Sequence, residues 1–287
     1  MENTKVSIVV LNYNDAITTS TFVKSINDFE MVDHIVVVDN CSNDGSYEKL
    51  LKLVSDKIDV IQSDRNGGYG YGNNYGIRYL KKKYDPAYVA ISNPDVEISS
   101  NTIEKCLDVM RSNCNCAVVA PMMKMSDNTI NYKCAWKIPT FYQYLLFSLV
   151  FLGRYGNKMY YSPKVLNQAG AVKVGCVAGS FLIVNLNRFS NTELYDENIF
   201  LFCEETVLGI KVFRMRFETI LLRDQFFIHH HSVSINKSIK SRYRQKAIMW
   251  KSREYVLNTY YTINWCKKAL VTIIKTLSLL ETRLLRL

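Results

Sequence analysis

Three apolar runs in the first third of the chain each end in polar side chains. They are Val6–Leu11, His34–Val38 and Tyr88–Ser92, and they are followed by Asn12, by Asp39 and by Asn93-Pro94-Asp95. A short, continuous apolar run is typical of a buried strand in a parallel sheet. Proline has no N–H to donate to a central ladder, so the third strand must end before Pro94. Asp95 is therefore expected just beyond the carboxyl end of that strand.

Segments with the spacing of helices alternate with these strands. They cover about residues 17–26, 46–53, 75–83 and 100–111, and short strands are expected at 60–61 and 117–120. Alternation of this kind predicts an α/β fold, with a mostly parallel central sheet flanked by helices. In open α/β sheets, ligands bind at the carboxyl ends of the strands. The loops ending at Asp39, at Gly67–Asn74 and at Asp95 should therefore gather at one edge.

The second half of the chain is harder to interpret. A hairpin over Lys124–Trp136 and a loop over Gly153–Gln168 are expected there. Regular structure returns with a strand over Val174–Val184, and Asp196–Glu205 leads into a helix ending near Arg216. We expect a catalytic domain over residues 1–236, with halves that meet near residue 121, and a helical extension over 237–287.

Positive charge is concentrated in that extension. The chain has a net charge of +10, and residues 237–287 hold 12 of its 36 Lys and Arg but only 2 of its 26 Asp and Glu, which leaves 24 of each before them. A basic tail on a neutral domain suggests an anionic partner, either a membrane or a nucleic acid. A nucleic-acid binder would spread basic residues over a sheet face or groove. The neutral first 236 residues argue against nucleic acid.

The tail also has helical periodicity and many aromatic residues. An apolar face and an opposite polar face are expected; the apolar one holds Leu270, Ile273, Ile274, Leu277 and Leu284, and the polar one Lys268, Thr272, Lys275, Thr282 and Arg286. The preceding aromatic residues are Trp250, Tyr255, Tyr260, Tyr261 and Trp265. This combination predicts a helix lying on an anionic membrane leaflet. The alternatives are a helix pair packed on the catalytic domain and a contact between copies in a homo-oligomer.

Cysteine usage and hydropathy bear on the compartment. The eight cysteines form no C-x-x-C pair and are scattered, which is typical of small core residues in a reducing compartment. Met1–Lys5 is too polar for a signal peptide, and the apolar run Phe141–Leu152 is too short to span a bilayer. We expect a cytoplasmic protein, peripheral on the inner face of the cell membrane.

Each candidate site residue has a structural alternative when it is taken alone. Gly67–Gly72 lacks the spacing of a dinucleotide fingerprint, so it is either a plain turn or a close backbone approach to a ligand. Asp39 either accepts a hydrogen bond from a nucleobase or caps a turn. Asp95 either holds a divalent cation or is a surface acid.

Two clusters near the end of the catalytic domain have the same ambiguity. Glu204 and Glu205 either favour a helix dipole or include a general base whose pKa is raised by its neighbour. The three histidines His229–His231 either are structural or include a metal or phosphate ligand.

In series, these motifs resemble the family 2 glycosyltransferases, and most closely the rhamnosyltransferase-like branch that assembles bacterial surface polysaccharide. The likeness spans about residues 6–236. It is carried by Asn12-Tyr13-Asn14, Asp39-Asn-x-Ser-x-Asp-Gly-Ser, Asn66-x-Gly-x-Gly-x-Gly-Asn-Asn, Asn93-Pro-Asp95, Gly179-Ser-Phe-Leu-Ile, Asp196-Glu-x-x-Phe-Leu-Phe-x-Glu-Glu and His229-x-x-x-x-Ser.

The resemblance implies a GT-A fold, a nucleotide-sugar donor, Mg²⁺ or Mn²⁺ as cofactor, and inverting transfer to a hydroxyl group. It implies Glu205 as the catalytic base, with Glu204 as second choice, and Asp95 with His229, or else His231, as metal ligands. The implied nucleotide and donor contacts are Asn12, Tyr13, Asp39, Arg65, Asn66, Gly67, Gly70, Gly72, Asn73, Asn74 and Asn93.

The expected donor is dTDP-rhamnose, with a UDP-hexose or UDP-galactofuranose as alternatives. The expected acceptor is a lipid-linked glycan of O-antigen or capsule synthesis. The chain departs from the family pattern at Val207, where a second acid is common, near Phe217, where a glycine is missing, and at Asn93, the first position of the D-x-D-like motif. Val207 is the best argument for the rival hypothesis, an inactive scaffold of a polysaccharide-assembly complex.

Overall fold

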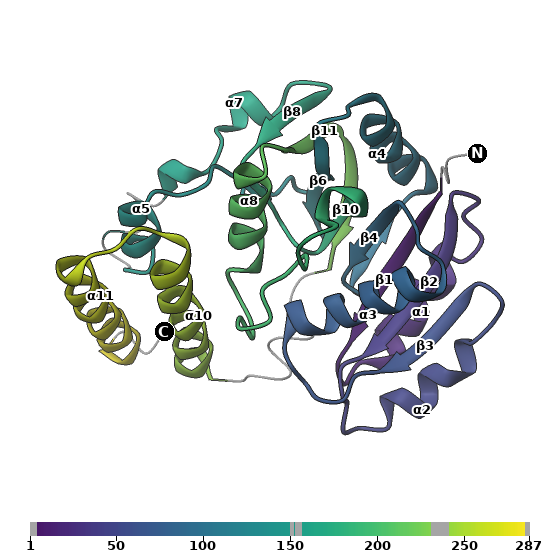
Figure 1. Ribbon diagram of the computed structural model, residues 1–287, viewed down its shortest axis with the longest axis horizontal. Helices are drawn as coiled ribbons and strands as arrows, with labels where there is room; N and C mark the ends of the chain where they lie inside the picture. Colours follow the sequence, from purple (N-terminus) through teal and green to yellow (C-terminus); the bar gives the residue numbers. More distant parts are fainter. Residues whose placement is uncertain (1–4, 150–151, 153–156, 231–240, 285–287) are drawn as a thin grey trace.

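A mixed β-sheet forms the centre of the molecule in this computed structural model, which describes residues 5–149, 152, 157–230 and 241–284 (Figure 1). Within the described chain, its strands follow the order β3-β2-β1-β4-β10-β6-β11-β5, and β8 pairs with β11. The strands are β1 Val6–Asn12, β2 Val32–Asp39, β3 Ile58–Gln62, β4 Tyr88–Ser92, β5 Val96–Ile98, β6 Cys116–Met125, β8 Ala171–Val174, β10 Phe181–Asn185 and β11 Glu218–His229.

Strands β3, β2, β1 and β4 are parallel to one another, and the connecting helices cover the faces of this half of the sheet (Figure 1). Strands β1, β2 and β4 are almost entirely buried, and β1 and β2 are rich in Val and Ile, as expected for strands covered on both faces. The predicted α/β fold is confirmed. The second half is mixed, because β10 runs antiparallel to both β4 and β6. The helices are α1 Ala16–Ile26, α2 Ser46–Leu50, α3 Tyr69–Lys83, α4 Ser100–Ser112, α5 Phe141–Leu146, α7 Pro163–Leu166, α8 Glu204–Arg214, α10 Arg242–Tyr260 and α11 Trp265–Leu284.

Helix α3 begins at Tyr69, six residues before the predicted start at Tyr75. The expected loop over Gly67–Asn74 is therefore wrong in its second part. The glycines here serve close packing: a Cβ at Gly72 would lie 2.3 Å from the Leu11 side chain, and one at Gly76 would lie 2.7 Å from Val9. The helix can approach β1 only because these side chains are absent.

The predicted hairpin over Lys124–Trp136 is wrong in its second strand. Lys124 forms an isolated bridge with Ile130, but strand β7 (Ala135–Trp136) pairs with β9 (Cys176–Val177) in a separate two-stranded sheet. The expected loop over Gly153–Gln168 includes helix α7 and a short 3₁₀ turn at Asn157–Met159.

Helices α10 and α11 pack together, and α11 also contacts α5. Figure 1 shows these three helices at one end of the molecule. They share a second apolar core that includes Trp250, Val256 and Ile274 and reaches Val207 on α8. Among the described residues, no helix is both long enough and apolar enough to cross a bilayer.

This packing corrects the predicted amphipathic face and the role of the tail aromatics. Ile274 points into the second core, whereas Ile273, Leu277 and Leu284 are exposed on α11. The hydroxyls of Tyr255 and Tyr260 donate to Asp196 at 3.0 and 2.6 Å. Most of these aromatics therefore hold α10 to the catalytic domain, and Trp265, 79% exposed, is the exception.

Candidate active site

The Asn12 and Asp39 side chains, which end β1 and β2, are fully buried and in direct contact. Asn12 Nδ2 donates to Asp39 Oδ1 at 2.7 Å. The other carboxylate oxygen accepts from the Ser42 backbone N–H at 3.0 Å and from Gln62 at 3.1 Å. Asp39 thus ties three loops together at the carboxyl edge of the sheet. Tyr13 lies beside this group and is half-buried.

A second network connects β2 to the start of α3. Asn40 Nδ2 donates to Asn66 Oδ1 and to the Gly68 carbonyl, both at 3.1 Å. Gly68 has a φ of +92°, and a Cβ there would lie 1.9 Å from the Phe200 carbonyl oxygen. The Tyr69 N–H donates to that carbonyl at 3.0 Å. The turn before α3 is therefore held directly against the segment that precedes Glu204.

Asn73 and Asn74 lie inside α3 and are fully buried. Asn74 donates to the Tyr195 carbonyl at 3.0 Å and accepts from its N–H at 3.1 Å. Asn74 thus fixes α3 to residues 195–197, whereas Asn73 donates to the Tyr69 carbonyl inside α3 and its buried Oδ1 has no hydrogen-bond partner in the described structure. Arg65, by contrast, is exposed on the rim, where it stacks on the Tyr71 ring at 4.4 Å.

Asp95 and His229 form a buried pair at the same edge of the sheet. The antiparallel ladder of β5 and β11 places Val96 opposite His229, and the His230 N–H donates to the Asp95 carbonyl at 2.9 Å. As a result, His229 Nε2 lies 3.2 Å from Asp95 Oδ1. Side chains alternate along a strand, so His230 turns outward toward Glu97. His231 lies outside the described residues.

The Asp95–His229 pair fits one divalent cation. Neighbouring ligands of an octahedral Mg²⁺ at about 2.1 Å lie about 3 Å apart, close to the observed separation of 3.2 Å. The same distance also suits a direct hydrogen bond between the two side chains. No group of three or more His, Cys, Asp or Glu side chains with metal-binding geometry occurs in the described residues. Within the described residues, Asp95 and His229 would thus supply two ligands of such a cation.

The Glu204–Glu205 pair opens α8 and faces the end of β4. A Cβ at Gly179 would lie 3.2 Å from Glu205 Oε1 and 3.2 Å from the Tyr69 hydroxyl, which donates to the Gly179 carbonyl at 2.7 Å. The next residue, Ser180, accepts a hydrogen bond from the Asn93 N–H at 2.8 Å. Short contacts thus connect Glu205 to the Asn93-Pro-Asp95 turn.

Burial raises the pKa of both carboxyl groups. For Glu204 the pKa is well above its ordinary value because of burial and then the charge of Glu205. For Glu205 the pKa is raised by burial and partly restored by backbone hydrogen bonds, including one with Gly179. Glu205 is partly exposed, whereas Glu204 is 4% exposed. Glu205 is therefore the less enclosed residue of the two, and its raised pKa suits a general base.

Two features of this edge carried no signal in the sequence. Phe202 and Cys203, directly before the acid pair, both have positive φ values, +70° and +79°. Strain of this kind in non-glycine residues is concentrated at functional sites. Tyr69 contacts Gly179 and Tyr195, yet in the sequence it is one tyrosine within a glycine-rich run.

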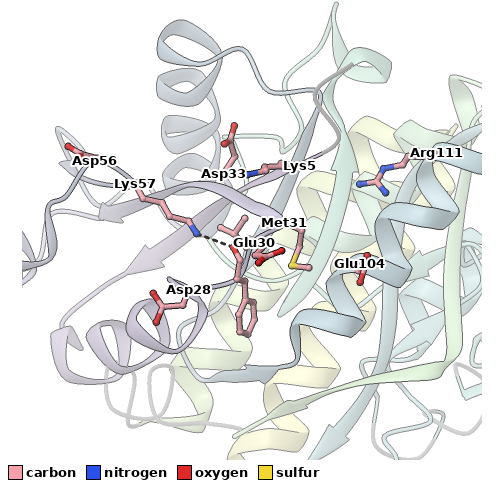
Figure 2. A pocket seen from close by; sticks show the side chains of 11 residues that line it. Lys5, Asp28, Glu30, Met31, Asp33, Asp56, Lys57, Glu104 and Arg111 are labelled. Atoms are coloured by element: carbon pink, nitrogen blue, oxygen red, sulfur yellow. Dashed lines mark hydrogen bonds between the residues drawn. The ribbon is translucent and has the colours of Figure 1, made fainter. Parts of the chain in front are cut away.

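A separate hollow of about 660 Å³ lies at the opposite, amino edge of the sheet (Figure 2). Acids such as Asp33 and Glu104 and bases such as Lys5 and Arg111 line it together. The Lys57 ammonium donates to the Phe29 carbonyl at 3.0 Å there. None of the predicted site residues lines this hollow, so the candidate site is confined to the carboxyl edge.

Solved glycosyltransferase structures share this fold. GalNAc-T7 with UDP, GalNAc and Mn²⁺ superimposes with a TM-score of 0.61 at 14% identity, covering 80% of this chain and 44% of that chain. The mannosyltransferase PcManGT from Pyrobaculum calidifontis, in complex with GDP-Man and Mn²⁺, gives a TM-score of 0.56 at 14% identity, covering 96% and 69%. These likenesses confirm the predicted GT-A fold.

Sequence relatives are sugar transferases. The low-salt glycan biosynthesis hexosyltransferase Agl10 of Haloferax volcanii is 33% identical over 40% of this chain and 35% of its own length. The rhamnosyltransferase WbbL of Escherichia coli K12 is 24% identical over 50% and 54%. The N-acetylglucosaminyl-diphospho-decaprenol L-rhamnosyltransferase of Mycobacterium tuberculosis is 22% identical over 71% and 68%. The chain thus spans about a third of the length of Agl10 and about half of the length of WbbL.

Residues 7–172 match the family described as glycosyl transferase family 2. That match covers more than half of the chain and includes Asn12, Asp39 and Asp95. The chain belongs to glycosyl transferase family 2.

Proposed function

We propose that the chain is an inverting, metal-dependent glycosyltransferase that takes its sugar from a nucleotide-sugar donor. The observation that carries this proposal is the buried Asp95–His229 pair, 3.2 Å apart, at the edge that also holds Asn12, Asp39 and Glu205. Sugar transfer from a nucleotide diphosphate needs cation ligands, a nucleotide site and a base. The Asp95–His229 pair, the buried Asn12–Asp39 pair and Glu205, whose pKa is raised, match these three needs.

Each group has a defined task in this proposal. Glu205 takes the proton of an acceptor hydroxyl as that oxygen attacks the anomeric carbon, while the bond from that carbon to the diphosphate breaks on the opposite face. Asp95 and His229 would hold Mg²⁺ or Mn²⁺. When bound, such a cation neutralises charge on the departing diphosphate. Asn12, Tyr13 and Asp39 form the nucleobase end, and Arg65 and Asn66 border the donor.

For the donor we propose dTDP-rhamnose, and for the acceptor a lipid-linked glycan of bacterial O-antigen or capsule synthesis. Support comes from two relatives whose names specify rhamnosyl transfer, one of them onto a diphospho-decaprenol acceptor. A UDP-hexose is the second candidate donor, because the relative that is 33% identical over 40% of this chain is named a hexosyltransferase. UDP-galactofuranose is a further candidate.

We also propose that α11 rests on the inner leaflet of the cell membrane. Exposed apolar side chains lie along its outer side at Trp265 and then, every three or four residues, at Ile273, Leu277, Leu280 and Leu284. We call these residues the α11 stripe. Lys267 and Lys268 lie beside its start, and the tail carries the whole positive excess of the chain. An apolar stripe bordered by cations matches an anionic lipid surface.

Sugar transfer tests the enzymatic proposal directly. The purified protein would be screened for thermal stabilisation by nucleotide sugars with and without Mn²⁺, since a ligand of the folded state stabilises it by mass action. Transfer of the best donor onto an isoprenyl-diphosphate N-acetylhexosamine would be followed by mass spectrometry. We expect D95A to abolish transfer while remaining folded, and D56A, in the distant hollow, to retain it. Donor binding without transfer in the wild type would favour the inactive scaffold instead.

A further inference from the structure

Arg253 is a buried guanidinium in the second core, and no role has been given to it above. It lies on α10 and is 4% exposed. Three aromatic rings surround it: its Cζ lies 4.9 Å from the centre of the Tyr144 ring, 5.7 Å from Trp250 and 5.9 Å from Phe147. A guanidinium is attracted to the face of an aromatic ring. Its N–H groups, however, point outward in the plane of the guanidinium and still need hydrogen-bond acceptors.

The hydrogen-bonding edge of Arg253 is unsatisfied. Its Nε and Nη1 atoms are buried and have no hydrogen-bond partner in the described structure. Among the described residues no carboxylate forms an ion pair with Arg253. Arg223 differs clearly, because its Nε, Nη1 and Nη2 all donate to carbonyl oxygens. Leaving charged donors buried and unpaired is costly, so Arg253 is suited to an anion that the described part of the chain does not provide.

Arg253 lies near the segment that leads to the candidate base, because the hydroxyl of its neighbour Ser252 donates to the Leu201 carbonyl at 2.7 Å, three residues before Glu204. The pKa of Tyr160 is raised by burial, lowered by the charge of Arg253 and raised by that of Glu205. The pKa of Cys203, next to the acid pair, likewise responds to Arg253 after burial. Trp250, which stacks against Arg253, also shares the second core with Cys203, directly before the helix that opens with Glu204 and Glu205.

We propose that Arg253 binds the phosphate oxygens of a diphosphate group. The planar fork of arginine suits two phosphate oxygens at once. Two sources of this chemistry exist if the proposed function is correct, and to that extent the inference rests on it: the donor nucleotide and the lipid-linked acceptor. Arg253 lies on α10, which packs against the helix that carries the α11 stripe, so a lipid diphosphate at the membrane surface is the source that the geometry favours.

Binding measurements test this proposal without sugar transfer. Farnesyl diphosphate, inorganic pyrophosphate and dTDP or UDP with Mn²⁺ would be titrated calorimetrically into the full-length protein. We expect R253M to weaken farnesyl diphosphate and pyrophosphate binding at least tenfold, and R253K, which keeps the charge but loses the fork, to weaken it less. The matched control is R283M, because Arg283 also stacks on a tyrosine, Tyr243 at 4.6 Å, but is exposed.

The outcomes separate the two sources from a structural role. Loss of farnesyl diphosphate and pyrophosphate binding with nucleotide binding kept supports the acceptor source, and loss of nucleotide binding supports the donor source. If R253M lowers the melting temperature but leaves every affinity unchanged, Arg253 only supports the core and the proposal is overturned.

A second measurement avoids substituting Arg253. In a W136F/W265F protein, Trp250 is the remaining tryptophan, and its emission should change on addition of farnesyl diphosphate or pyrophosphate. An emission that responds to none of the diphosphates would also overturn the proposal. If no nucleotide sugar stabilises the protein, the proposed function fails. Calorimetry and Trp250 emission with farnesyl diphosphate and pyrophosphate would still test the role of Arg253, so the two failures can be told apart.

Discussion

Glu204 and Glu205 are adjacent in sequence, but their surroundings differ. Glu204 is almost completely enclosed, and its Oε1 has no hydrogen-bond partner within the described structure. Glu205 keeps accessible surface and contacts the Gly179 region. A general base must reach the proton it removes, so exposure separates two residues that the sequence alone cannot rank on physical grounds. The pKa of Glu204 is instead raised well above its ordinary value, by burial and then by the charge of Glu205, so this carboxyl tends to keep its proton.

Glutamine at position 205 should remove the base without changing the shape of the site. For E205Q we expect kcat to fall by about 10²- to 10⁴-fold, the usual contribution of a general base, with donor affinity nearly unchanged. Steady-state kinetics and nucleotide titration would measure the two quantities. E104Q, in the hollow at the amino edge, is the control. Wild-type kcat in E205Q, combined with a strong loss in E204Q, would move the base to Glu204.

The raised pKa of Glu204 predicts how stability depends on pH. Between the ordinary value of 4.5 and the raised pKa, the folded state binds a proton that the unfolded state releases. Stability must therefore fall as pH rises through this window, by at most about 1.4 kcal/mol per pH unit for one group. E204Q lacks this loss, so its advantage over the wild type should grow from pH 5 to pH 8 in urea denaturation. An advantage that shrinks as pH rises would contradict the assigned direction.

Individual residues were predictable where a strand led directly to them. Asp39 and Asp95 follow continuous apolar strands, so their position at the carboxyl edge follows from the polarity pattern alone. The contact of Asp95 with His229 depends on the pairing of β5 with β11, and the family resemblance supplied it. Arg253 could not be predicted from the sequence. It is one of 36 basic residues, and the sequence does not show that three aromatic rings surround it in the fold.

At the scale of elements, the turn before α3 depends on Gly68, and a matched pair of glycines tests this. Gly68 and Gly170 both have positive φ, +92° and +81°, but a Cβ at Gly170 would meet nothing within 4 Å. G170A should therefore cost only backbone strain, about 1–2 kcal/mol. G68A should cost at least about 2 kcal/mol more, because its Cβ would collide with the Phe200 carbonyl. Chemical denaturation measures both, and equal losses would show that the close approach does not limit stability.

Element boundaries failed where packing overrode local preference. Glycine disfavours helix interiors, so the Gly-rich run was expected to remain a loop until Tyr75. In the fold, α3 packs so closely on β1 and β2 that larger side chains at Gly72 and Gly76 would collide with Leu11, Val9 and Val38. Tertiary contact therefore extends the helix backward to Tyr69. Strands were easier to predict, because burial on both faces leaves an unbroken apolar run in the sequence.

At the scale of the whole molecule, the described residues form two apolar cores, and this changes how the tail can be tested. The second core joins α5, α10 and α11 to Val207 and Cys203, beside the acid pair. Truncation after Asn236 would expose that core and disturb the site, so loss of membrane binding in such a protein would prove little. The predicted boundary at residue 236 remains a proposal. Point changes on the outer side of α11 avoid this problem.

The α11 stripe should account for membrane binding. Burying one large apolar side chain contributes about 1.5–3 kcal/mol, so I273E/L277E should reduce co-sedimentation with anionic liposomes by at least tenfold. Neutral liposomes should bind the wild type less than anionic ones, and added salt should weaken the binding because the lysines contribute through charge. Unfolding midpoints should remain similar, since both side chains are already exposed.

The control for this experiment is F213E. Phe213 is exposed on α8, so the substitution removes an equally accessible apolar side chain from another surface. If only I273E/L277E loses liposome binding, the stripe is the membrane contact. If both variants bind like the wild type while I273E/L277E becomes monomeric in a protein that otherwise dimerises, the stripe joins two copies of the chain. A lipid-linked acceptor would then have to approach the catalytic edge without help from α11.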